Sequence, residues 1–217
     1  MVPDSARRVL RAAVQAANTP PAKRRLSRTL KSTPRPLSLE IGGLQARPGW
    51  LVTNVNATAH NFLDATTRWP MEDSAARFIY ADNVVEHITL AGTRVMLQEA
   101  HRCMAPGGII RIVTPDIRRH VELYLDGRAS LDSPTGRHYR DAGLIVEHPV
   151  DLVRVPIASF GHHTGYLYDY ETLASELIDG GFRDVVRCEL GASVHPELVD
   201  LDAGREGGSQ LVVEARR

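Results

Sequence analysis

The stretch from Arg77 to Pro115 constrains the fold more than any other part of the chain. Its run 78–81 (Phe-Ile-Tyr-Ala) is apolar and rich in aromatic and branched residues, which predicts a buried strand. Apolar residues then recur at helical spacing over 93–104, and Pro106 followed by two glycines ends that helix, because proline cannot continue it. The apolar run 109–113 predicts a second strand. A strand, a helix, a tight turn and a strand form a βαβ unit, so the sequence predicts a parallel sheet.

Size and charge exclude several classes of protein. The 217 residues suffice for one α/β core, and the formal net charge of zero with 24% charged residues excludes a chain that binds nucleic acid through its overall charge. No apolar run approaches the roughly 20 residues of a membrane span, and three arginines interrupt the N-terminal segment where a signal peptide would be apolar. Two cysteines are too few for a disulfide framework. We therefore expect a cytoplasmic protein without a membrane span.

The segment "YADNVVEHI…LQEAHRCMAPGGIIRIVTPD" resembles a known family. It is similar to the block from the fourth to the fifth strand of class I S-adenosylmethionine (SAM)-dependent methyltransferases, in which an EH pair precedes a PGG turn by about twenty residues. The resemblance runs from about residue 36 to the C-terminus. It implies a doubly wound, Rossmann-like α/β sheet of seven strands with the last strand antiparallel. It also implies a methyltransferase domain (36–217) and, within it, a long lid insertion after the fifth strand (about 116–169), and it leaves a basic N-terminal helical arm (1–35) outside.

The predicted first and second strands end in residues that the resemblance places at the cofactor. The first strand ends at Gly42 and Gly43, where a backbone without side chains lets a ligand approach closely. In the family this turn contacts the methionine moiety, and Glu40 corresponds to the acid that faces its amine, although the third glycine of the fuller motif is missing. Asn54 ends the second strand where the family has a carboxylate that binds the ribose, and Asn56 follows two residues later. A neutral amide accepts hydrogen bonds more weakly than a carboxylate.

Two further positions complete the predicted cofactor site. Asp64 and Ala65 resemble the family segment in which the acid contacts the adenine amino group and the next residue packs on the ring. The alternative for Asp64 is a turn cap, and we favour the adenine contact. Asn83 follows the fourth strand at the same edge of the sheet, so we expect it beside the Gly42–Gly43 turn.

The N-terminal arm carries nine Lys or Arg residues and one acid. Its apolar spacing predicts a short amphipathic helix that ends near Thr19, Pro20 and Pro21. It serves either as a basic arm for an acidic surface or a lid over the active site, or as a solvated helix on the domain's own flank or on a second copy in a homodimer. We favour the solvated helix, because charge runs of this length are usually solvated.

A methyl group moves from a sulfonium by in-line displacement, and a hydroxyl acceptor also needs a base or a metal for its proton. No Asn-Pro-Pro-Tyr-like segment of the amide or adenine N-methyltransferases occurs, which favours an oxygen acceptor. Among the lid histidines we rank His148 first, because Glu147 and Asp151 flank it, then His163, with His162 as the third candidate. Adjacent histidines without a cysteine make a poor zinc pair. A divalent cation such as Mg²⁺, held by carboxylates, is the alternative, with its ligands unassigned.

The predicted acceptor is a small, polar molecule. His87 either holds its helix or reaches the substrate, and Tyr166 and Tyr168 offer the aromatic faces and polar edges that sugars need. The pattern resembles small actinobacterial, including mycobacterial, methyltransferases that act on sugars, such as the 1-O-methylation of methylmannose polysaccharides. Two alternatives stay open: a degenerate fold that serves as a binding or scaffold module, and a nucleic-acid methyltransferase recruited by the basic arm. The overall charge does not favour nucleic acid.

Overall fold

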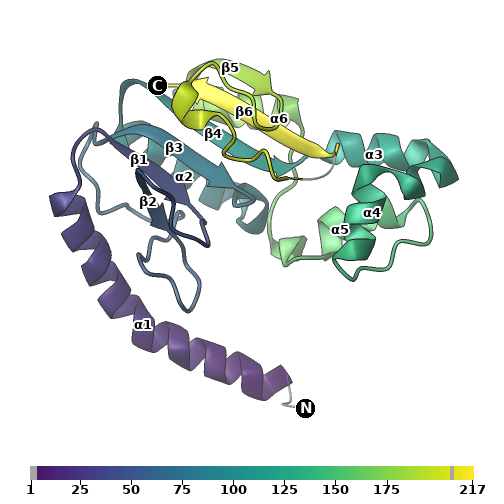
Figure 1. The fold of residues 1–217 in the computed structure, drawn as a ribbon, viewed down its shortest axis with the longest axis horizontal. Coiled ribbons are helices and arrows are strands. Elements are labelled where there is room, and N and C mark those ends of the chain that lie inside the picture. Colours follow the sequence, from purple (N-terminus) through teal and green to yellow (C-terminus); the bar gives the residue numbers. More distant parts are fainter. Residues whose placement is uncertain (1–3, 206–207) are drawn as a thin grey trace.

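The computed structural model describes residues 4–205 and 208–217, and for residues 4–8 and 163 the backbone alone. Six strands form one sheet in the order β2-β1-β3-β4-β6-β5 (Figure 1). All neighbours are parallel except that β6 runs antiparallel to both β4 and β5. The predicted α/β sheet with an antiparallel last strand is confirmed. The strands are β1 (Leu37–Ile41), β2 (Trp50–Thr53), β3 (Ala76–Asp82), β4 (Met104–Pro115), β5 (Arg183–Cys188) and β6 (Gln210–Arg216).

In the described part of the chain, one α-helix precedes the sheet, and five further α-helices and four 3₁₀ helices connect the strands. The α-helices are α1 (Asp4–Ser32), α2 (Leu90–Cys103), α3 (Ile117–Leu125), α4 (Pro134–Asp141), α5 (Asp151–Ala158) and α6 (Tyr170–Asp179). The 3₁₀ helices are η1 (Val85–His87), η2 (Gly127–Asp132), η3 (His162–Thr164) and η4 (Pro196–Leu198). None of the helices in these described ranges is long and apolar enough to cross a membrane.

The two faces of the sheet are covered differently. Residues of α2, α6 and the second half of α1 pack with every other residue of the strands into the main core. The opposite face carries Phe78 and Tyr80, and there the connection from β5 to β6, with η4, supplies the cover through Leu198 and Leu201. The expectation of a doubly wound sheet therefore needs correction, because within the described residues the helices cover one face and a long loop covers the other (Figure 1).

Of the seven expected strands one is missing, and a single bridge takes its place. Beyond β2, Asn54 and Phe62 form an isolated parallel bridge, and the Nδ2 of Asn61 donates to the Val52 carbonyl at 3.0 Å. The Oδ1 of Asn54 accepts the backbone N–H of Asn56 at 2.9 Å. Such local side-chain bonds compete with a strand ladder, so this asparagine-rich segment forms turns and caps the sheet edge.

The N-terminal helix is longer than the sequence predicted. Instead of ending near Pro20, α1 continues through both prolines to Ser32. Its second half is fixed by Ala22, Leu26 and Leu30, which recur every four residues and are all at most 5% exposed. The packing of this apolar stripe outweighs the local preference of the prolines. The first half projects from the body (Figure 1), with Leu10 65% exposed.

The insertion expected as a lid is a helical group with a small core of its own. It contains α3, α4, α5, η2 and η3, and it lies beyond the carboxyl end of β4 (Figure 1). Its core consists of Leu123, Tyr139, Val146, Leu152 and Val155. Because this group packs on itself, the long connection after β4 has a fixed shape.

Candidate active site

The Gly42–Gly43 turn lies at the carboxyl end of β1, beside the end of β3. Gly42 has φ of +81°, and a Cβ there would lie 2.5 Å from the Cγ2 of Val84. Any other residue would be strained in this left-handed conformation and would displace Val84. The Nδ2 of Asn54 donates to the carbonyls of Gly42 and Gly43 at 2.7 and 3.1 Å. The turn, Asn54 and the residues after β3 are thus brought together, as the parallel sheet requires.

Glu40 is buried beneath this turn and paired with a loop cation. The Nε of Arg47 donates to the Glu40 Oε2 at 2.7 Å, and this bond raises the pKa of Arg47. A Cβ on Gly43 would come within 2.8 Å of the other Glu40 oxygen and 2.4 Å of Val52. The missing side chain at Gly43 therefore leaves room for Glu40, and a ligand amine would share that carboxylate with Arg47.

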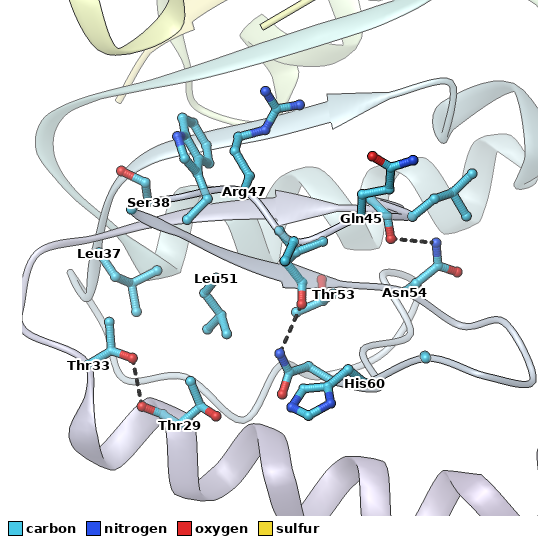
Figure 2. Close-up of a pocket in the computed structure, with 18 of the residues that line it drawn as sticks. Thr29, Thr33, Leu37, Ser38, Gln45, Arg47, Leu51, Thr53, Asn54 and His60 are labelled. Atoms are coloured by element: carbon cyan, nitrogen blue, oxygen red, sulfur yellow. Dashed lines mark hydrogen bonds between the residues drawn. The ribbon is translucent and has the colours of Figure 1, made fainter.

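A groove runs between the β2 edge and the end of α1. Its volume is about 750 Å³, and Figure 2 shows Arg47, Gln45 and Asn54 on its upper side and Thr29 and Thr33 on the helix side. Gly43 and Asn56 also line it. We call this space the groove. Part of its polar lining comes from the two strand ends at which the sequence predicted the cofactor, and the rest comes from α1, the start of β1 and the loops after β1 and β2.

A second cavity, the cleft, lies at the carboxyl ends of β3 and β4. Its volume is about 940 Å³, and Asn83, His87, His162 and Arg205 line it together with residues of the helical insertion. Gln45 lines both the groove and the cleft, so the two spaces adjoin. Both volumes lie within the roughly 300–1,000 Å³ usual for small-molecule sites.

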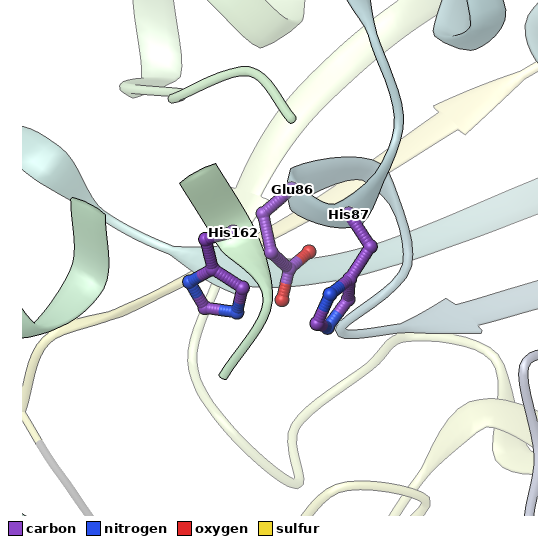
Figure 3. Close-up of side chains that lie close together, drawn as sticks. All are labelled: Glu86, His87 and His162. Carbon is purple, nitrogen blue, oxygen red and sulfur yellow. The ribbon is translucent and has the colours of Figure 1, made fainter. Parts of the chain in front are cut away.

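Three polar side chains meet at the wall of the cleft. Glu86 and His87 come from η1 and His162 from η3, and their ligand atoms all lie within 4.8 Å of one another (Figure 3). The two imidazole rings are edge to face with centroids 4.6 Å apart. Glu86 is 1% exposed, and this burial raises its pKa to about 8. Burial and the neighbouring His162 lower the pKa of His87. Burial therefore favours the protonated form of Glu86 and the neutral form of His87.

Other predicted residues lie away from both cavities. His148 is exposed at the start of α5, where its backbone N–H and that of Glu147 donate to Asp151 Oδ2, each at 3.0 Å. Tyr166 is 37% exposed and lines neither cavity. Tyr168 is fully buried and donates its hydroxyl to the Thr93 Oγ1 at 2.8 Å. The side chain of His163 lies outside the described residues, so its role at the active site stays a prediction.

The two residues predicted at the adenine have local roles in the fold. Asp64 Oδ1 accepts from the backbone N–H and the hydroxyl of Thr66 at 2.9 and 2.7 Å. Ala65 is buried in the main core. Neither lines the groove or the cleft. The turn cap, which the sequence left as the alternative for Asp64, is the geometry observed.

Two groups at the cleft have partners that sequence reasoning missed. Arg205, in the β5–β6 connection, forms an ion pair with Asp82 at 2.7 Å across 123 positions of sequence. Tyr139 lines the cleft and shares a 2.6 Å hydrogen bond with the Nε2 of buried His120, whose Nδ1 lies 2.8 Å from the Asp116 carbonyl. These two residues lie 19 positions apart in the sequence, and no local pattern linked them.

Comparisons with known proteins give likeness in structure alone. No family model matches the chain, and no curated protein matches its sequence. Among solved structures, the CurJ carbon methyltransferase is 16% identical with a TM-score of 0.47, covering 86% of this chain and 50% of its own. A SAM-dependent methyltransferase from Thermotoga maritima is 15% identical with a TM-score of 0.45, covering 94% and 91%. Phosphoethanolamine N-methyltransferase 2 of Haemonchus contortus, solved with SAM, is 14% identical with a TM-score of 0.48, covering 89% and 52%.

These structural neighbours are SAM-dependent or other methyltransferases that transfer to carbon or nitrogen. This chain spans about half the length of the first and third of them. With TM-scores below 0.5, the likeness carries no conclusion about the acceptor or the site of this chain.

Proposed function

We propose that this protein is a SAM-dependent methyltransferase that binds its cofactor at the carboxyl ends of β1, β2 and β3. The observation that carries the proposal is a pair of adjoining cavities that meet at Gln45. The cleft lies at this edge, and the groove runs along β2 from Trp50 to Asn54 and so reaches the same edge. Ligands of open parallel sheets bind at this edge. The groove takes the adenosine part and the cleft takes the acceptor, so the reactive sulfonium lies where they meet.

The proposed cofactor contacts use the hydrogen-bonding groups that each residue does not already use within the protein. The backbone of Gly42 and Gly43 lies against the methionine moiety, with Glu40 sharing its carboxylate between Arg47 and the ligand amine. Asn54 already uses its Nδ2 on the glycine carbonyls. Its Oδ1 accepts one backbone N–H and keeps a second lone pair for the ribose.

Asn56, Asp64, Ala65 and Asn83 are secondary candidates in this proposal. Asn56 lines the groove and Asn83 the cleft, so each can contact a ligand in the conformation described. Asp64 and Ala65 contact the adenine only if the 55–66 segment rearranges when the cofactor binds.

The proposed acceptor is a hydroxyl of a small polar molecule, with a sugar as the first choice. The acceptor oxygen forms a bond to the methyl carbon while the sulfur–carbon bond breaks, and the sulfonium becomes a neutral thioether. The hydroxyl proton must leave, and His162 and His87 line the space where it is released. Because His148 lies outside the cleft, we assign the proton to the Glu86–His87–His162 cluster in its place. Within the sugars, the 1-hydroxyl of a methylated mannoside is the specific candidate.

The test is methyl transfer from labelled SAM to a panel of sugars, with release of S-adenosylhomocysteine measured in parallel. We expect His162→Ala to slow turnover roughly 10²–10⁴-fold, the usual effect of losing a group that handles the proton. His148→Ala serves as the matched control and should leave turnover within a factor of a few. Equal rates for both variants and the wild type would refute the assignment of the proton.

The same experiments separate the alternatives. A scaffold module would bind S-adenosylhomocysteine without turning over any acceptor, or would not bind it at all. A nucleic-acid methyltransferase would bind RNA or DNA with a steep salt dependence that disappears when residues 1–14 are removed, of which residues 9–14 are exposed on α1. Either result would overturn the sugar assignment.

A further inference from the structure

Three side chains at the cleft wall have the donor set of a transition-metal site. Glu86 supplies carboxylate oxygen, and His87 and His162 supply imidazole nitrogen, all within 4.8 Å of one another. Two His and one carboxylate suit zinc and similar ions, whereas Mg²⁺ prefers oxygen ligands alone. Ligand atoms of a tetrahedral zinc site lie about 3.3 Å apart, so these side chains need to close by up to about 1.5 Å. His87 is exposed and free to supply most of that movement.

The buried ligands are already oriented by second partners. The Nδ1 of His162 lies 2.9 Å from the Pro156 carbonyl, which fixes the ring proton on Nδ1 and leaves the lone pair on Nε2. Glu86 Oε2 accepts the Thr114 hydroxyl at 3.1 Å. The Asn83 amide, oriented to satisfy both of its neighbours, donates to Glu86 Oε1 at 3.3 Å. Hydrogen bonds of this kind hold metal ligands in place in known sites.

The backbone is also built to bring the two segments together. A Cβ at Gly165 would lie 1.7 Å from the Glu86 carbonyl oxygen, so only glycine lets the end of η3 approach η1 this closely. This approach carries His162 to Glu86. The carboxyl group there is almost fully buried and, among the described residues, forms no salt bridge. A buried carboxylate without a cation is costly, and a bound ion would compensate its charge.

We propose that Glu86, His87 and His162 bind one divalent transition-metal ion, with Zn²⁺ as the best match. Three protein ligands leave a fourth position of the ion open, and two of these ligands line the cleft. The binding of the ion does not depend on methyl transfer, whereas its use in catalysis rests on the proposed function. There, the cluster would handle the acceptor's proton through the ion and not through a free imidazole. The acceptor hydroxyl would take the open position and release its proton to water more readily, since a bound divalent ion lowers the pKa of a coordinated hydroxyl. The ion keeps its oxidation state, and the oxygen then attacks the methyl group.

The experiment is calorimetric titration of ZnCl₂ into the full chain after treatment with EDTA, without SAM or acceptor. We expect the wild type to bind one equivalent. His162→Ala and Glu86→Gln should each weaken binding by more than about 100-fold, because losing a ligand costs more than the 10–100-fold loss seen for second partners. His138→Ala is the matched control, since His138 lines the same cleft outside the cluster, and it should bind like the wild type.

The outcomes are distinct. A wild type that takes up no Zn²⁺, or variants that bind as tightly as the wild type, would overturn the proposal. If His162→Ala fails to fold, Glu86→Gln and His87→Ala give the answer, because the first keeps the side-chain shape and the second alters an exposed residue. Zn²⁺ binding without SAM binding would support the metal site and refute the proposed methyltransferase. SAM binding without Zn²⁺ binding would support the methyltransferase and refute the metal site.

Discussion

Arg111 offers the most quantitative test of how the sheet is joined to the loop that covers it. Its side chain is fully buried, and all five of its N–H groups are used. They reach both oxygens of Asp202 at 2.8 and 3.0 Å, Glu214 at 2.6 Å, and the carbonyls of Ala192 and Glu189 at 2.9 and 3.2 Å. Arg111 thus ties β4 to β6 and to the β5–β6 connection, which carries residues into the cleft.

Arg111→Met would leave two carboxylates buried without a cation. Asp202 and Glu214 are 2% and 4% exposed, so neither gains much water when the guanidinium is removed. Breaking a buried ion pair on one side costs about 3–5 kcal/mol. A domain of ordinary stability has about 5–15 kcal/mol, so the variant should fold but be marginal.

Urea unfolding followed by circular dichroism measures this cost. Arg216→Met is the matched control, because Arg216 also lies in the sheet but forms an exposed ion pair with Asp184. Exposed pairs contribute roughly 0–1 kcal/mol, and the control should lose no more than that. If Arg111→Met loses as little as Arg216→Met, the buried network does not hold the loop and the reasoning is refuted.

Three further substitutions test other parts of the account. Gly42→Val should abolish S-adenosylhomocysteine binding in calorimetry, whereas Gly107→Val, at a similar φ of +78° with open space around it and outside both the groove and the cleft, should suffer only the strain and keep affinity. Leu26→Ala should lower the free energy of unfolding by about 2–5 kcal/mol and Leu10→Ala by less than about 0.5. Equally small losses in both variants would show that α1 is not held through its second half. The pKa of Asp151 is lowered to about 2 by backbone N–H groups and an arginine, so its stabilising effect is present above about pH 4 and lost toward pH 2. Asp151→Asn should therefore melt below the wild type at pH 7, and a gap unchanged at pH 2 would contradict this.

Local patterns sufficed for the centre of the sheet. The strands β3 and β4 were predicted because each is a continuous apolar run buried on both faces, with a helix of clear period between them. The Gly42–Gly43 turn was predicted for the same reason, since a strand feeding two glycines is a local signal. These features depend on residues close together in the sequence.

Features that depend on tertiary contacts were not predicted. The prolines at 20 and 21 indicate a helix end, yet the burial of Leu26 and Leu30 against the sheet keeps α1 continuous. A seventh strand was expected by resemblance, but the asparagine side chains after β2 bond their own backbone. No rule of spacing could show this outcome.

The candidate site also combines residues that local patterns predicted with one that only tertiary contacts bring in. Glu86 and His87 are neighbours in sequence and were noticed as an EH pair, whereas His162 reaches them only through the close approach at Gly165. Ranking the histidines by their sequence neighbours favoured His148, but the Asp151 carboxylate beside it binds the backbone N–H groups of Glu147 and His148 and not an imidazole. Which histidine faces the cleft is decided by the packing of the helical insertion.

The central claim is that SAM binds where β1, β2 and β3 end. A crystal structure of the full chain grown with S-adenosylhomocysteine tests it most directly. We expect the methionine part of the ligand to lie against Gly42 and Gly43 and its adenosine to lie in the groove. Its sulfur should face His87 and His162 across the cleft. A structure at saturating ligand that shows neither the groove nor the turn occupied, or that shows the ligand bound elsewhere, would contradict it.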